Sequence, residues 1–164
     1  MDRRGRAWGK RKWGISMGFA ESVRTVLRRK YLTFSGRAGR SEYWWFQLFF
    51  WGLLLALFVL FGVVTDATRR PDGYSSSTTF IIVVIGLFIL AMFLPQAALH
   101  VRRFHDRNMS GWWYFVAVIL SFVPYIGRGA GIGILIVSAL RGTEGPNKYG
   151  QDPLRPEGRA EVFA

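Results

Sequence analysis

The side chains best suited to chemistry lie in one short run, RRFHD at 102–106. An imidazole next to a carboxylate can move protons, so His105 and Asp106 are the first candidates for a catalytic role. They are adjacent in the chain, however, and adjacent side chains do not readily face each other. We therefore favour a structural role, in which Asp106 pairs with Arg103 or with an arginine from 37–40, and His105 hydrogen-bonds in the same cluster.

The residue types do not favour a metal site or a cofactor site. On a helix, His100 and His105 would point about 140° apart, and the chain has no cysteine and no third histidine. No phosphate loop, zinc-protease motif or Ser/His/Asp arrangement occurs, so we expect no metal and no cofactor. A membrane enzyme acting on lipid or envelope precursors would use Glu42 with His105 and Asp106. These three residues are weak candidates, and a non-enzymatic protein is the favoured interpretation.

The elements that must position these residues are long uncharged stretches. The run 43–64 has twenty-two residues without a charge, and as a helix it would be about 33 Å long, close to the thickness of a bilayer core. A second such run covers 80–99. The segment 19–34 has apolar residues at spacings of three and four, backed by arginines, which predicts an amphipathic helix at the membrane surface.

The predicted fold is therefore a small all-α, polytopic membrane protein with three transmembrane helices and an N-terminal interfacial helix. Its expected parts are a basic disordered arm at 1–16, a membrane domain at 17–153 with spans at about 43–64, 80–99 and 112–140, and a flexible tail at 154–164.

The third apolar stretch, 112–140, allows two interpretations. As one helix it would be roughly 43 Å long, with Arg128 inside it. As a hairpin turning at 124–131, neither arm would reach the 20 residues of a comfortable crossing, and the span count would be four. We favour one kinked or tilted crossing with Arg128 facing other helices, which places the tail outside.

The charges indicate orientation and partners. The chain carries a net charge of +12, with twelve Lys/Arg before the first span and two, Arg69 and Arg70, in the loop after it. This asymmetry places the N-terminus in the cytoplasm. No nucleic-acid reader motif accompanies the positive charge, so the expected partners are the bilayer and its anionic headgroups rather than nucleic acid.

Arginines and tryptophans gather at the cytoplasmic ends of the predicted spans, where such residues contact headgroups or a partner protein. We expect 36–45 and 102–106 to meet at one headgroup plane. An oligomeric transporter or channel component, with Gln96 and Arg128 on its pathway, is an alternative. The expected lipid- or partner-contacting residues are Arg37, Arg40, Trp44, Trp45, Arg102, Arg103, Arg107, Trp112 and Trp113.

Three motifs resemble one bacterial membrane family. FSGRAGRSEYWW at 34–45, RRFHDRNMSGWW at 102–113 and GTEGPNKYGQDP at 142–153 occur in the order typical of the domain of unknown function 805 family, which includes YhaH-like inner-membrane proteins. The resemblance implies a bacterial inner membrane location. The family has no assigned activity, so it implies no mechanism. Residues 1–16 and Arg128 depart from the family pattern.

Overall fold

The computed structural model describes residues 17–68 and 75–154. Its regular structure in these residues is helical, apart from one isolated bridge between Asn147 and Gly150. The helices confirm the all-α prediction. The predicted arm at 1–16 and residues 155–164 of the predicted tail lie outside the described residues.

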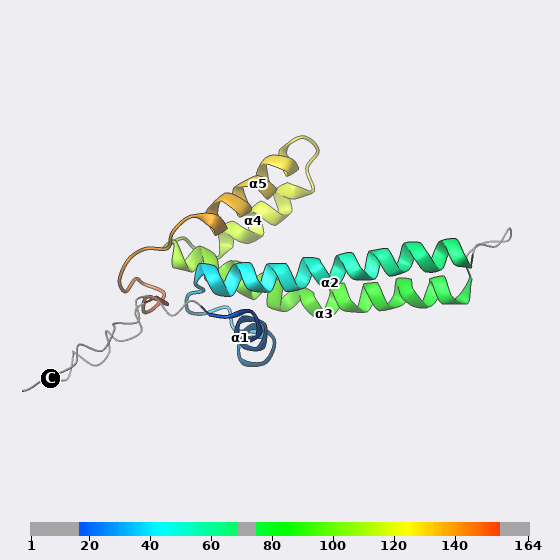
Figure 1. Cartoon of the computed structure of the whole chain (residues 1–164). Coiled ribbons are helices and arrows are strands. Elements are labelled where there is room, and N and C mark those ends of the chain that lie inside the picture. The colour runs from blue at the N-terminus through cyan, green and yellow to red at the C-terminus, as the bar shows by residue number, and fades with distance from the viewer. Residues whose placement is uncertain (1–16, 69–74, 155–164) are drawn as a thin grey trace, which may run out of the picture.

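Two long antiparallel helices form the main hairpin of the molecule (Figure 1). Helix α2 is Arg40–Ala67 and helix α3 is Ser76–Asp106, and both are long and apolar enough to cross a membrane. At 28 and 31 residues they extend beyond the uncharged runs 43–64 and 80–99. The helices are longer than the runs because an uncharged run marks only the part of a helix that lies in the hydrocarbon core. The helix itself continues beyond that core until its backbone turns. The charged residues 102–106 thus belong to the last turns of α3.

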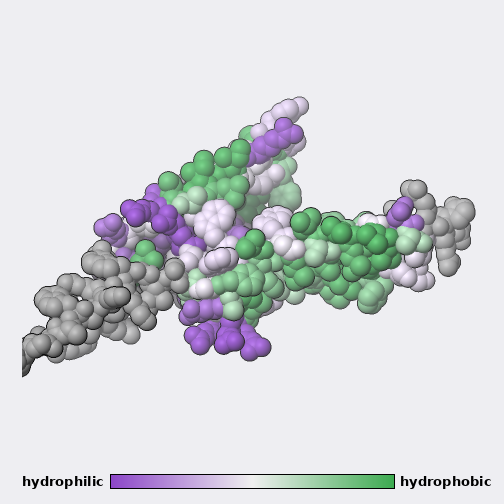
Figure 2. All heavy atoms as spheres, viewed as in Figure 1, coloured by the Kyte–Doolittle hydropathy of each residue, from purple (hydrophilic) through white to green (hydrophobic). Residues whose placement is uncertain are grey.

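The surface of this hairpin explains why it needs a membrane. Large apolar side chains, such as Trp51, Leu55, Phe80 and Leu90, are more than half exposed. Figure 2 shows a largely hydrophobic surface along the visible face of α2 and α3, with most hydrophilic residues toward one end and a few at the other. Apolar surface of this extent requires lipid or protein to cover it.

The prediction of one crossing at 112–140 is wrong, because this stretch forms a second hairpin. Helix α4 (Trp112–Ser121) and helix α5 (Ile126–Ala139) pack against each other and are joined by a turn at 122–125. Gly127 permits the turn, since a Cβ at this position would overlap the backbone of Ser121. The helices have 10 and 14 residues, or about 15 and 21 Å, so each is shorter than a bilayer core.

The N-terminal helix is shorter than predicted. Helix α1 is Phe19–Arg24 and continues as a π-helical segment, Thr25–Arg29, so helical structure ends five residues before Phe34. The chain leaves the helix where its side chains reach the main hairpin: the Lys30 ammonium lies 3.6 Å from a carboxylate oxygen of Glu42, and the Tyr31 hydroxyl donates to the carbonyl of Ala91.

The buried apolar core lies where the N-terminal segment meets α2 and α3. Val26, Ala38, Tyr43, Phe46 and Leu99 form the buried core, next to the start of α2 and the end of α3. The two hairpins diverge from this end of the molecule, which we call the head (Figure 1). The head comprises residues 17–46, 99–111 and 138–154. From here on, we call residues 141–154 the tail. The prediction that the chain after the last span lies on the opposite side from the N-terminal segment is wrong, because 143–150 contacts Arg37, His105 and Asp106.

Candidate functional site

The two arginine-rich motifs meet in the head, as the sequence predicted. Antiparallel pairing of α2 and α3 brings the start of one helix beside the end of the other (Figure 1). The backbone N–H of Ala38 donates to the carbonyl of Arg102 at 3.1 Å, which fixes the segment before α2 against the last turns of α3. Side chains separated by sixty or more residues in the chain can therefore form direct ion pairs.

Asp106 is the centre of one part of a buried charge network, together with Arg37 and Arg103, and the other part is the pair of Glu42 and Arg102. Its Oδ1 accepts from Nε of Arg37 at 2.8 Å, and its Oδ2 accepts from Nη1 of Arg103. The three side chains are between 0 and 4% exposed. The predicted pairing of Asp106 with Arg103 or an arginine from 37–40 is confirmed for both partners. A buried carboxylate held in this way is typical of a structural role.

Glu42 forms the second pair of the network. Its Oε1 accepts from Nη1 of Arg102 at 2.5 Å, and both side chains are almost fully buried. Lys30 approaches the other oxygen of Glu42 from the N-terminal segment. The network therefore joins the N-terminal segment, α2 and α3 through charge-assisted contacts.

Backbone carbonyls of the tail and of α5 accept from Arg37 and Arg103, whereas Nε and Nη2 of Arg102 are buried without a partner among the described residues. Arg37 donates to the carbonyls of Gly145 at 2.6 Å and Thr143 at 2.5 Å. Arg103 donates to the carbonyls of Ser138 and Leu140 at the end of α5. A buried cation is stabilised by hydrogen bonds as well as by its counter-charge, so these carbonyls support the two arginines that pair with Asp106.

His105 is held beside the network rather than inside it. Its Nδ1 lies 3.2 Å from the carbonyl of Gly36, and its ring stacks on Tyr149 at a centroid distance of 3.8 Å. His105 lies beyond the apolar run 80–99, and desolvation lowers its pKa, against the hydrogen bond to Gly36, which raises it. The prediction that His105 forms a hydrogen bond is confirmed, but its partner is a backbone carbonyl beside the charge network.

The tail also covers the end of α3. The N–H of Thr143 donates to the carbonyl of Asp106 at 2.8 Å, and the side-chain amide of Asn147 donates to the carbonyl of His105 at 3.0 Å. Gly142 passes so close to Asp106 that a Cβ there would overlap the carboxylate. Sequence reasoning did not place the tail in the site, although its motif accompanies the other two.

The predicted contact residues fall into two groups. Arg37, Arg102 and Arg103 are buried and bonded within the chain, so their guanidinium groups do not face lipid. The other group retains side-chain surface for contact with a headgroup or partner, and consists of Arg40, Trp44, Trp45, Arg107, Trp112 and Trp113.

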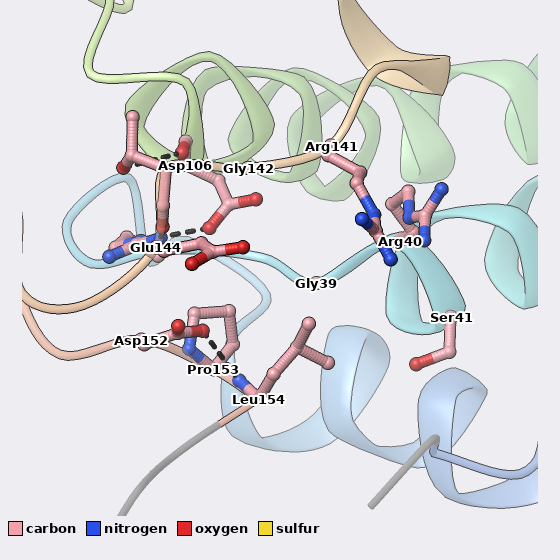
Figure 3. Close-up of a pocket in the computed structure, with 12 residues that line it drawn as sticks. Gly39, Arg40, Ser41, Asp106, Arg141, Gly142, Glu144, Asp152, Pro153 and Leu154 are labelled. Atoms are coloured by element: carbon pink, nitrogen blue, oxygen red, sulfur yellow. Dashed lines mark hydrogen bonds and ion pairs between the residues drawn. The ribbon is translucent and has the colours of Figure 1, made fainter. Parts of the chain in front are cut away.

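A pocket of about 340 Å³ opens next to the network, between the start of α2 and the tail. Arg40 and Arg141 both line it, and in Figure 3 their side chains extend toward one another. Neither guanidinium has a carboxylate partner among the described residues. Glu144 and Asp152 also line the pocket, and both Asp152 oxygens accept backbone N–H groups, from Gly145 and Leu154.

Nothing in the described residues forms a metal site, since no group of three or more His, Cys, Asp or Glu side chains lies close enough together. Both oxygens of Asp106 already accept from guanidinium groups. The arrangement is thus suited to holding the head together and to presenting the two arginines of the pocket, and it lacks an accessible acid–base pair.

Comparisons with known proteins agree with the three motifs. The profile of the family described as protein of unknown function (DUF805) matches residues 31–151. Inner membrane protein YhaI of Escherichia coli K12 is 35% identical over 125 residues, covering 76% of this chain and 89% of the relative. Inner membrane protein YhaH of the same strain is 33% identical over 127 residues, covering 76% and 90%. No solved structure matches this chain.

Proposed function

We propose that this chain, which belongs to the DUF805 family of proteins of unknown function, is a multi-pass inner-membrane protein that binds the phosphate of anionic lipid headgroups at its head. The two relatives are inner membrane proteins by name, which supports the location. The function is one of binding rather than catalysis, with the pocket arginines Arg40 and Arg141 as the contacts.

One observation carries this proposal. Of the arginines in the head, Arg37, Arg102 and Arg103 are used internally, whereas Arg40 and Arg141 converge on the 340 Å³ pocket without a carboxylate partner among the described residues. Two neighbouring guanidinium groups repel each other unless an anion lies between them. Phosphate accepts several hydrogen bonds from such a pair, so a lipid phosphate suits the pocket.

The proposed topology places the head in the cytoplasm. Twelve basic residues precede the uncharged run 43–64 of α2 and two lie between α2 and α3, which favours a cytoplasmic start of α2. The tail packs on the same end, so the C-terminal segment is cytoplasmic as well. Helices α2 and α3 then cross the bilayer, and α4 and α5 dip into the cytoplasmic leaflet. Exposed Trp44, Trp45 and Trp112 lie near the headgroups.

Lipid binding is tested by native mass spectrometry of the detergent-purified chain, with phosphatidylglycerol and phosphatidylcholine of identical acyl chains. We expect the wild type to retain phosphatidylglycerol preferentially. A double variant, Arg40→Gln with Arg141→Gln, should lose at least about 10-fold in apparent affinity, because two charge-assisted contacts are removed. Arg128→Gln is the matched control, since Arg128 is also an exposed arginine but lies on the first turn of α5.

Two results would contradict the proposal. One is equal retention of both lipids by the wild type. The other is an unchanged preference in the double variant while its melting temperature matches that of the wild type. Because both arginine side chains are exposed and outside the buried charge network, their loss should leave folding intact.

A further inference from the structure

A second cleft lies between the two hairpins, closer to the hydrocarbon than the head pocket. It has a volume of about 270 Å³ and is lined by residues from all four helices of the hairpins. Aromatic rings form much of its wall, including Trp51 on α2 and Tyr114 on α4. Three polar side chains also face it, Gln47, Gln96 and His100. Polar groups at this depth are costly and usually have a function.

The hydrogen bonds of these polar side chains have one consistent direction. The Nδ1 of His100 lies 2.8 Å from the backbone carbonyl of Gln96, and a carbonyl can only accept, so Nδ1 carries the proton. With no carboxylate among its partners the imidazole is neutral, and its Nε2 is therefore an acceptor. The hydroxyl of Tyr43 and the amide nitrogen of Gln47 donate to it at 3.2 and 3.3 Å.

The same logic orients both glutamines. Because the amide nitrogen of Gln47 must face His100, its Oε1 faces Gln96 and accepts from the amide nitrogen of Gln96 at 3.1 Å. The Oε1 of Gln96 is then the end of the chain of hydrogen bonds. It is buried and has no partner within the described residues. Rotating the amide of Gln96 by 180° would not give every polar atom a partner, since Oε1 of Gln96 would then face Oε1 of Gln47.

We propose that this cleft binds a bilayer-soluble molecule with an uncharged ring head bearing a hydroxyl group, such as a hydroquinone lipid. The amide of Gln96 turns on binding, so that its buried Oε1 reaches the cleft and accepts from the hydroxyl. An unpaired buried acceptor requires a donor, which a hydroxyl supplies and a carbonyl does not. The ring of Tyr114 already stacks on His100 at 4.8 Å, and a flat ring extends this aromatic wall. A volume of about 270 Å³ holds one ring head, with its chain left along the apolar helices.

The site is distinct from the lipid phosphate pocket of the head, with which it shares no lining residue. The two proposals can therefore fail independently. Diacylglycerol is a second bilayer molecule with an uncharged hydroxyl head, but it has no ring for the aromatic wall, so the experiment includes it as a separate arm.

The test is isothermal titration of the full chain in detergent with an alkyl hydroquinone, its dimethyl ether and a short-chain diacylglycerol. We expect the hydroquinone to bind about 10- to 100-fold more tightly than the ether, which cannot donate to the buried acceptor. Gln96→Leu should abolish this preference. The diacylglycerol should bind more weakly than the hydroquinone.

A second variant guards against misfolding of Gln96→Leu. Leu135 lines the cleft from α5, and Leu135→Trp should block the cleft while leaving the polar chain on α2 and α3 in place. Equal binding of hydroquinone and ether by the wild type would overturn the proposal, as would a preference that survives in either variant. Tighter binding of diacylglycerol would overturn the assignment of a ring head.

Discussion

Replacing Asp106 by asparagine should destabilise the protein strongly although the side chain keeps its shape. The carboxylate accepts from both Arg37 and Arg103, and the three side chains are at most 4% exposed. An amide offers one acceptor and one donor, so one guanidinium would face an N–H group. Two buried positive charges would also lose their only common counter-charge among the described residues.

The magnitude follows from the burial of this network. Removing one partner of a buried ion pair costs about 3–5 kcal/mol. Arg37 and Arg103 keep their carbonyl acceptors in the tail and in α5, which spread the remaining charge. We therefore expect a loss near the lower limit, about 3 kcal/mol, which corresponds to a fall in Tm of about 6–12 °C for a chain of this size.

The assay is thermal unfolding in detergent, followed by tryptophan fluorescence. Glu144→Gln is the matched control, because Glu144 is an exposed carboxylate in the same tail. It should leave Tm unchanged within about 1 °C. A variant Asp106→Asn that melts together with the control would refute the reasoning. A double variant, Arg37→Met with Asp106→Asn, should lose less than the sum of the two single changes, since the partners are coupled.

Two further changes test the packing of the tail. Gly142→Ala should lower stability by about 1–3 kcal/mol, because its Cβ overlaps the Asp106 carboxylate, whereas Gly52→Ala, with no neighbour within 4 Å, should be close to neutral in the same melting assay. Tyr149→Ala should cost about 1 kcal/mol or more by removing the ring stacked on His105, and Tyr149→Phe should retain wild-type stability; equal effects of these two substitutions would show that the stack contributes nothing.

The membrane hairpin could be predicted because its signal is local. A run without charge, such as 43–64, indicates a span regardless of what it packs against. The pairing of Asp106 with arginine was also predictable, since a carboxylate among apolar and basic residues needs a counter-charge. That Asp106 pairs with both Arg37 and Arg103 depends on the register between α2 and α3, which the residue types do not specify.

The hairpin at 112–140 was only the second interpretation of the sequence and the docking of the tail was not predicted, for different reasons. The turn depends on the close approach of Gly127 to the backbone of Ser121, and a single glycine in a glycine-rich apolar stretch does not reveal such a contact. The tail contributes mainly backbone carbonyls, such as those of Thr143 and Gly145. Every residue has a carbonyl, so no sequence pattern marks the ones that bind a guanidinium.

The account as a whole depends on the head, in which the tail is docked against the start of α2. A Cβ placed on Gly39 would lie 3.8 Å from the Cβ of Pro153, which is the separation of a disulfide. The chain has no cysteine, so a double variant, Gly39→Cys with Pro153→Cys, can be tested in membranes without further changes. Gly52→Cys with Pro153→Cys is the control, because Gly52 has no neighbour in reach.

Mild oxidation of membranes that contain these variants is the most direct measurement. The cross-link is detected by a cysteine-reactive mass tag, added to the denatured protein with and without prior reduction. We predict rapid and nearly complete disulfide formation in the variant at 39 and 153, and none in the control at 52 and 153. Failure of the first pair to cross-link, or cross-linking of both pairs at the same rate, would contradict the docked tail and with it the head on which the lipid pocket depends.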